Sequence, residues 1–225
     1  MKITFWSDFA CPYCYIGLTR LKRVLGELGL EGKVTIEPKS FQLRKGDSYG
    51  DCPTCGQVRQ TLEGTNAAHF RKKYRLSEED AGGCFAEMAR MGASEGLDIH
   101  YETAPLVYTE DAHRLVKYAF DMGGEALAEK LAEALFYMYL TKNQDISDHR
   151  VLLGIGKAVG LTEDGILSVL TSDLYGAEVM MDGIKAGMFG INVVPHFIID
   201  GTYAMQGVQD AEVMKEVIRT ALRGG

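Results

Sequence analysis

Two cysteines stand three positions apart in the sequence CPYC at residues 11–14, directly after a short apolar run. Residues 2–6 are apolar and β-branched and predict a strand. Residues 12–29 repeat apolar side chains at helical spacing and predict a helix, with Arg20 on its polar face. Residues 33–38 predict a second strand that Pro38 closes. A strand, a helix and a strand in this order predict a parallel crossover unit with Cys11 at its first junction.

A long helical block separates this opening from the end of the chain. Residues 44–66 are polar and contain glycines, and residues 67–188 show helical patterns only, with expected N-caps at Ser77, Thr109, Ser147 and Thr162. Strand patterns return at 196–200 and 203–205, before a closing helix at 210–223. The order β-α-β, then helices, then α-β-β-α predicts one α/β fold with a large all-helical insertion. We assign residues 1–65 and 174–225 to the α/β domain and 66–173 to the insertion.

The composition narrows the classes of partner. The formal net charge of −7 argues against nucleic acid, because phosphate binding needs a basic surface. No apolar run is long enough to span a bilayer. We therefore expect no membrane-spanning segment and no membrane partner. Residues 1–14 lack the apolar stretch of a secretion signal, so we expect a cytoplasmic protein. In that compartment a close cysteine pair is more often catalytic or metal-binding than structural.

The position of CPYC favours redox chemistry. A thiol at a helix N-terminus faces unpaired N–H groups and the positive end of the helix dipole, and both stabilise a thiolate. Pro12 fits the first helical position, where its missing N–H costs nothing. Cys14 is expected one turn further in, where it can attack a mixed disulfide on Cys11. An inert buried pair and half of a zinc site are the other interpretations.

A second feature lies near the C-terminus, in GINVVPHFIID. Pro195 directly precedes an apolar strand, where a proline cannot donate to the sheet, and the Val194–Pro195 bond is a candidate cis peptide. His196 is a candidate for stabilising the Cys11 thiolate, and a strand-edge histidine without a catalytic role is the alternative. Asp8 either hydrogen-bonds backbone near the cysteines or is a plain turn residue.

SDFACPYCYIG, the helical middle and GINVVPHFIIDGTYAMQGVQ together resemble the DsbA-like thioredoxin superfamily, in particular its cytoplasmic FrnE-type branch. The resemblance implies a thioredoxin-like fold with a helical insertion, and thiol–disulfide oxidoreductase activity on protein or small thiols. It implies that Cys11 is the nucleophile, Cys14 the resolving cysteine and Pro195 the cis-proline. The substrate-contact candidates are Val194, Pro12, Tyr13, His196 and Gln206, with Gln209 as a further candidate at the rim of the site.

A second cysteine pair, Cys52 and Cys55, departs from the family pattern. It is either a second redox pair that exchanges with the first, or a structural or regulatory disulfide, or part of a zinc site. The zinc site would use Cys52, Cys55, Cys84 and a histidine such as His69. By itself, Cys84 is expected to be a small buried hydrophobe.

Two other classes of function compete with disulfide exchange. Glutathione-dependent isomerases and kappa-type transferases resemble this organisation, but they typically have serine where Cys11 stands. A redox-regulated chaperone or metal-binding protein is the other alternative, resting on the second cysteine pair. We expect no cofactor, and glutathione stays open as a co-substrate.

Overall fold

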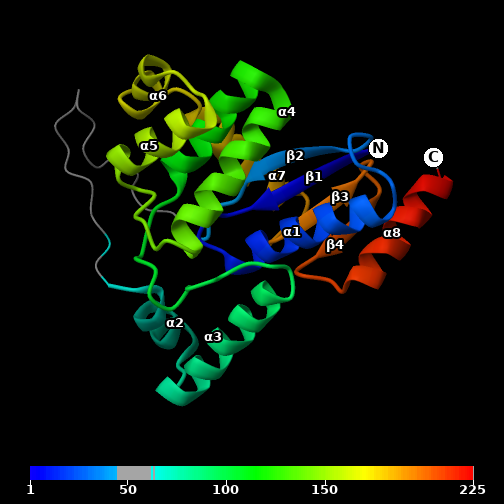
Figure 1. Ribbon diagram of the computed structural model, residues 1–225, viewed down its shortest axis with the longest axis horizontal. Coiled ribbons are helices and arrows are strands. Elements are labelled where there is room, and N and C mark those ends of the chain that lie inside the picture. Colours follow the sequence, from blue (N-terminus) through cyan, green and yellow to red (C-terminus); the bar gives the residue numbers. More distant parts are fainter. Residues whose placement is uncertain (45–61, 63, 225) are drawn as a thin grey trace.

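A computed structural model describes residues 1–44, 62 and 64–224. Its centre is a four-stranded sheet in the order β2-β1-β3-β4 (Figure 1). Strand β1 (Lys2–Ser7) pairs in parallel with β2 (Thr35–Ser40), and helix α1 (Pro12–Glu27) joins them. Strand β3 (His196–Ile199) pairs antiparallel with both β1 and β4 (Tyr203–Gln206). The two ends of the chain thus build one sheet, as the sequence predicts.

Pro38 lies inside β2 and does not close it. Its partner in β1 is Phe5, and the strand continues to Ser40. In the described part of the chain β2 is an edge strand, so a residue without an N–H donor is tolerated there. The predicted end of this strand is therefore wrong by two residues.

The helical segment contains α2 (Asn66–Tyr74), α3 (Glu78–Ala93), α4 (Glu110–Leu140), α5 (His149–Val159), α6 (Glu163–Leu170) and α7 (Gly176–Met188). The predicted caps at Ser77 and Thr162 are confirmed, because each hydroxyl accepts a backbone N–H. Asp148 caps α5 in place of Ser147, and Thr109 precedes α4 without a side-chain cap. Gly123 and Gly124 have non-helical backbone angles and interrupt α4 with a kink. None of the helices in the described ranges is both long and apolar enough to cross a membrane.

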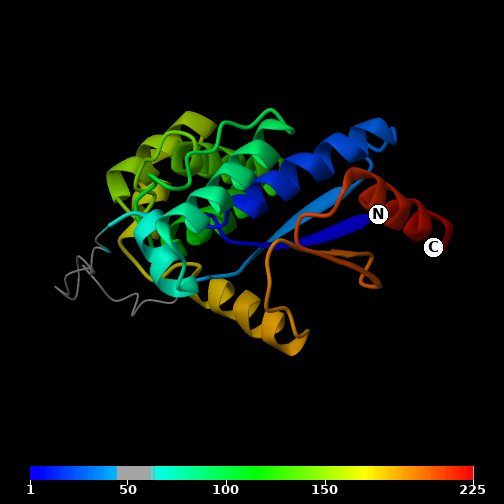
Figure 2. The ribbon, with the colours of Figure 1, turned by 90° about the horizontal axis from the view of Figure 1, so that it is seen from below.

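Helices cover both faces of the sheet. α1 lies on one face and α7 on the other (Figure 2). Phe5 and Phe197 stack at 4.8 Å on the face of α1, and the indole of Trp6 donates to the Asp182 carbonyl of α7 on the opposite face. Helix α8 (Ala211–Gly224) follows β4 and packs against α1.

Buried residues of the sheet and of α4, α5 and α6 belong to one hydrophobic core. Ala81, Phe85 and Met88 of α3 form a second, smaller cluster. The α/β fold with a large helical insertion is therefore as predicted. The division into two domains remains a prediction.

Arg20 is buried, although the helical pattern places it on the polar face of α1. Its Nε donates to Glu95 at 2.7 Å, and its Nη1 donates to the Gln209 carbonyl at 2.9 Å. These bonds link α1 to the end of α3 and to the segment before α8. A pattern of apolar residues cannot reveal them, because both partners come from distant parts of the chain.

Candidate active site

The two cysteines of CPYC lie where β1 leads into α1. Cys11 is the N-cap of the helix, and Pro12 follows at its first turn. Cys11 is 6% exposed and Cys14 is 0% exposed, and both are free thiols. The N-terminal N–H groups of α1 stabilise negative charge at the outer sulfur. A substrate can therefore reach Cys11 first, while Cys14 contacts only the protein.

Burial raises the pKa of the Cys14 thiol well above its ordinary value. The neighbouring Cys11 sulfur raises it further, whereas the backbone N–H of Asp8 lowers it. At neutral pH Cys14 is therefore a protonated thiol. It becomes a nucleophile only when another group takes its proton.

We expect the reduced protein to lose stability as the pH rises above about 9, the ordinary value for a thiol. The unfolded chain then releases the Cys14 proton while the folded chain keeps it, so the stability present below about pH 9 is lost above it. The slope contributed by this thiol approaches about 1.4 kcal/mol per pH unit. Urea unfolding of reduced wild type and Cys14→Ala at several alkaline pH values measures it. Equal slopes for the two proteins would contradict the assignment.

The Val194–Pro195 segment packs against the start of α1. The peptide bond between these residues is cis, as the sequence suggests. The Cys11 thiol donates to the Val194 carbonyl at 3.7 Å. On the helix side, a Cβ added to Gly17 would lie 3.0 Å from the Pro195 ring. The structure thus brings Cys11, Val194 and Pro195 together from the two ends of the chain.

Asp8 is fully buried and is not a plain turn residue. Its carboxylate accepts the backbone N–H of Ala10 at 3.0 Å and that of Leu43 at 2.6 Å. Burial alone would raise the pKa of Asp8, but the facing imidazole of His113 and these two N–H groups lower it. Asp8 therefore stays ionised beside the cysteine loop.

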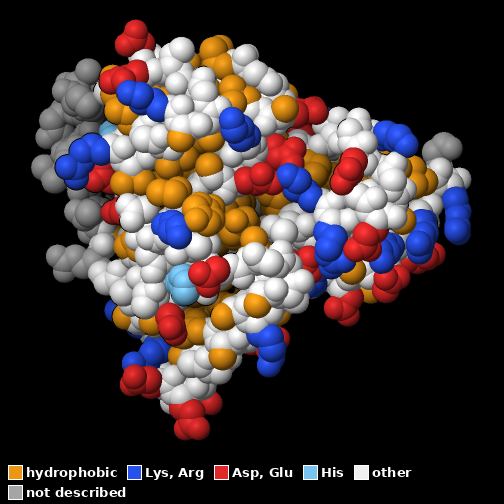
Figure 3. Space-filling view, in the orientation of Figure 1, with side chains coloured by type: hydrophobic (Ala, Val, Ile, Leu, Met, Phe, Trp, Pro, Cys, Tyr) orange, Lys and Arg blue, Asp and Glu red, His pale blue; other side chains and the backbone are white. Residues whose placement is uncertain are grey.

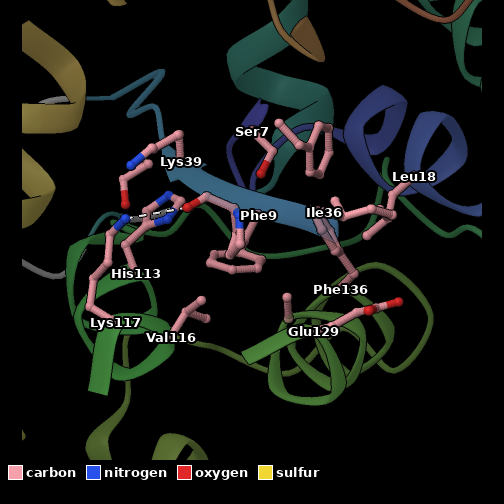
Figure 4. Close-up of a pocket in the computed structure, with 14 residues that line it drawn as sticks. Ser7, Phe9, Leu18, Ile36, Lys39, His113, Val116, Lys117, Glu129 and Phe136 are labelled. Carbon is pink, nitrogen blue, oxygen red and sulfur yellow. Dashed lines mark hydrogen bonds between the residues drawn. The ribbon is translucent and has the colours of Figure 1, made fainter. Parts of the chain in front are cut away.

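His113 on α4 is 3% exposed, and no sequence motif marks it as part of the site. Its Nε2 is 3.8 Å from the Asp8 carboxylate, and its ring lies 4.7 Å from that of Phe9. His113 and Phe9 line a cavity of about 20 Å³. Figure 4 shows the two side chains among the residues that line it. Because His113 follows the apolar spacing of α4, the sequence could predict its burial, but not its partner more than a hundred residues away.

His196 lies on the opposite face of the sheet from α1. The next residue, Phe197, points toward Gly17 of α1, and successive strand residues point to opposite faces. Burial lowers the pKa of the His196 imidazole, with no thiol contributing. The structure thus does not bring its ring to the side of the sheet where α1 carries the cysteines.

Gln206 pairs with His196 across β3 and β4, and its side chain is exposed. The next N–H, that of Gly207, donates to the Pro195 carbonyl at 2.7 Å. The Gln209 side chain donates to the Gln206 carbonyl at 2.5 Å. This segment thus supports Pro195 through its backbone, whereas a substrate contact by either glutamine remains a prediction.

Tyr13 connects the cysteine loop to the helical segment. Its side chain packs against the Ala81, Phe85 and Met88 cluster of α3. Burial raises the pKa of Tyr13, and the neighbouring Cys11 and Cys84 raise it further. Cys84 therefore lies close enough to Tyr13 to affect its charge, and it is partly exposed, in contrast to the buried position that the sequence suggests.

Cys52 and Cys55 lie outside the described residues. The redox, structural and zinc interpretations of this pair therefore remain predictions. Over residues 1–44, 62 and 64–224, no three His, Cys, Asp or Glu side chains gather as metal ligands.

Hydrophobic side chains are exposed next to Val194 and at the end of α7. Val193 is 43% exposed and directly precedes Val194, and Met188 and Phe189 at the end of α7 are 79% and 64% exposed. On another face, Figure 3 shows hydrophobic side chains gathered across the middle of the molecule, over α4. Exposed apolar surface of this kind is common where proteins bind other proteins.

Comparison with known proteins finds relatives that match nearly the whole chain. The chain is 26% identical to a probable DsbA oxidoreductase, SCO1869, from Streptomyces coelicolor, with a TM-score of 0.88 over 100% of this chain and 91% of that one. It is 23% identical to YwbO of Bacillus subtilis over 97% of this chain and 96% of that protein. The cytosolic disulfide reductase DsbM of Pseudomonas aeruginosa shares the fold, with a TM-score of 0.64, 14% identity and full coverage of both chains.

A match to a protein family covers residues 2–219 and is described as a DSBA-like thioredoxin domain. It includes both cysteines of CPYC, the helical segment and Pro195. Because the match extends from β1 into α8, it applies to the sheet and the inserted helices alike. The chain belongs to the family of DSBA-like thioredoxin domains.

Proposed function

We propose that this protein is a dithiol–disulfide oxidoreductase that exchanges disulfides through Cys11 and Cys14. The observation that carries the proposal is the position of Cys11 at the N-terminus of α1, with its sulfur 3.7 Å from the Val194 carbonyl. The helix terminus supports a thiolate, and the backbone at Val194 offers polar groups to an extended substrate.

In the reducing direction the Cys11 thiolate attacks a substrate disulfide. A mixed disulfide forms on Cys11, and one substrate sulfur leaves and takes up a proton. Cys14 then loses its proton and attacks Cys11, which forms the Cys11–Cys14 disulfide and releases the second substrate sulfur. Two electrons pass from the cysteine pair to the substrate, and the oxidising direction reverses each step.

Polypeptides are the substrate class that the surface favours. The exposed side chain of Val193 offers an apolar contact directly next to Val194, where residues flanking a substrate cysteine would lie. Glutathione is the second candidate, because DsbM, which shares this fold, has also been solved with GSH. That protein is described as cytosolic, which supports a cytoplasmic location for this one.

Two assays with the purified reduced protein test the proposal. We expect it to catalyse the reduction of insulin and the refolding of scrambled ribonuclease, and to exchange more slowly with oxidised glutathione. Faster turnover of glutathione than of either protein would favour the small-thiol alternative. No turnover of any of the three substrates would refute the proposed function.

A further inference from the structure

Helix α7 has a buried face and an exposed apolar face on opposite sides. Val179, Asp182 and Ala186 are buried. The Asp182 carboxylate accepts the backbone N–H of Ser40 at 2.9 Å and pairs with Lys117, which holds the buried face against β2 and α4. The opposite side, called the outer face below, carries large apolar side chains that are 43–79% exposed: Met180, Met181, Ile184 and Met188. In Figure 2 no other described element lies beyond α7 on this side.

The apolar area of the outer face is large for a surface in contact with water. Phe120 of α4 adjoins it, because Phe120 and Met181 line the same groove of about 450 Å³. With about 200 Å² for a fully exposed large side chain, Phe120 and the outer face together present roughly 500 Å². A standard interface buries about 800 Å² on each partner, somewhat more than half of it apolar. The exposed apolar area is therefore what one side of a stable dimer needs.

The outer face follows a heptad repeat, the pattern of two helices that pack side by side. The central positions of the repeat, a and d, hold apolar residues, with a at Met181 and Met188 and d at Ala177 and Ile184. One flanking position, e, holds the exposed charged residues Glu178 and Lys185. The other flanking position, g, holds Met180 and Gly187.

Two copies of this repeat are complementary in charge when they run antiparallel about a two-fold axis. The same flank of each helix then meets, so that e faces e and g faces g. Glu178 of one copy faces Lys185 of the other, and the symmetry repeats this ion pair. In a parallel pair, e would face the uncharged g position instead, and both charges would lack a partner. The charges therefore favour the antiparallel arrangement.

The same arrangement is complementary in size. On the g flank, Met180 of one copy faces Gly187 of the other. At the ends of the contact, Ala177 faces Met188, so a large side chain again meets a small residue. A surface that fits itself in both charge and size is the signature of a two-fold interface between identical chains.

We propose that this protein forms a homodimer in which α7 of each subunit packs antiparallel against α7 of the other. Met181 and Ile184 of both copies lie at the centre of the contact. The cysteines stay accessible, because α1 and α7 lie on opposite faces of the sheet (Figure 2). The inference goes beyond the proposed function and does not depend on it.

Sedimentation equilibrium from about 1 to about 100 μM measures the dimer directly. We expect the wild type to have twice the mass of one chain. Ile184→Asp places two carboxylates near the two-fold axis and should weaken the dimer at least about 100-fold. Leu222→Asp is the matched control, since Leu222 is also a helical side chain, 49% exposed against 47% for Ile184, but lies on α8. It should leave the mass unchanged.

Two substitutions at the e position test the antiparallel arrangement. Glu178→Lys and Lys185→Glu each replace both ion pairs by like-charge contacts, so each should weaken the dimer about tenfold. An equimolar mixture of the two variants should recover the wild-type affinity, because two lysines of one chain then face two glutamates of the other. Both changes leave the apolar centre intact, so this test holds even if Ile184→Asp does not fold.

A wild-type chain that stays monomeric up to about 100 μM would overturn the proposal. A dimer that Ile184→Asp leaves intact would also overturn it, since the contact then uses another face. The same holds if the mixed charge variants recover no affinity. A monomer whose binding to reduced, unfolded ribonuclease is lost in Ile184→Asp would show that the outer face binds other polypeptides instead. Absence of insulin turnover, by contrast, bears only on the proposed function.

Discussion

Insulin reduction falls to the uncatalysed background in Cys11→Ser, which is the largest effect that we expect from any substitution in this chain. Cys11 is the thiol at the N-terminus of α1 and the more exposed of the pair, so no other group of CPYC can start the exchange. A serine hydroxyl has similar size but does not ionise near neutral pH, which leaves the fold intact and removes the nucleophile. The turbidity of reduced insulin measures the loss.

We expect Cys14→Ser to abolish insulin reduction as completely as Cys11→Ser does. It should still carry out the first step, the attack of Cys11 on the substrate disulfide. Without the resolving thiol, the mixed disulfide on Cys11 accumulates, and mass spectrometry detects it as the added mass of the substrate. Cys84→Ser is the control, because Cys84 is also a free thiol but lies on α3. It should retain activity. Mixed disulfides that accumulate on Cys84, and not on Cys11, would refute the assignment of the nucleophile.

Local sequence patterns predict the parts of the site that a few neighbouring residues determine. CPYC between a strand and a helix is sufficient to place Cys11 at a helix N-terminus, because Pro12 and the apolar spacing fix where α1 begins. Likewise, a proline before the strand 196–199 is sufficient to suggest the cis bond at Val194. The approach of these two segments to each other comes from the resemblance to a family, and the strand pairing of β1 with β3 explains it.

Pairings between distant polar residues are the part that the sequence does not predict. Asp8 and His113 each have an unremarkable local pattern, and only the packing of α4 against β2 and α1 brings the two side chains to face each other. The predicted exposure of Arg20 is wrong for the same reason, because Glu95 and Gln209 come close to it only in the folded chain. Hydrophobic periodicity predicts which face of an element is buried, but it does not identify the charged residue from a distant segment that packs against that element.

Gly17→Val should disrupt the contact between α1 and the Val194–Pro195 segment. A Cβ at residue 17 would lie 3.0 Å from the Pro195 ring and 3.4 Å from the Phe197 ring. The Pro195 ring is fused to the backbone and the Phe197 ring is fully buried, so neither can move aside easily. The two further methyl groups of valine increase the overlap. We expect unfolding to become easier by about 1–3 kcal/mol, as for other overpacked cores.

Gly17→Val should also displace the Val194–Pro195 segment, and activity should then fall by more than the loss of stability explains. Moving Val194 away from Cys11 by about 1 Å separates the substrate backbone from the thiol, and a displacement of this size costs roughly 100-fold in rate. Urea unfolding and the kcat/KM for insulin measure the two effects on the same preparation. Gly17→Ala should show a smaller loss of both, because it adds only the first methyl group.

Gly154→Val is the matched control, because Gly154 is also a helical glycine but a Cβ there meets no atom within 4 Å. Valine and glycine differ little in helix propensity, so its stability should change by no more than about 0.5 kcal/mol. Its activity should equal that of the wild type. If Gly17→Val instead keeps full activity, the Pro195 ring does not fix the distance between Val194 and Cys11. Substrate binding would then depend on contacts elsewhere, such as the exposed side chains at the end of α7.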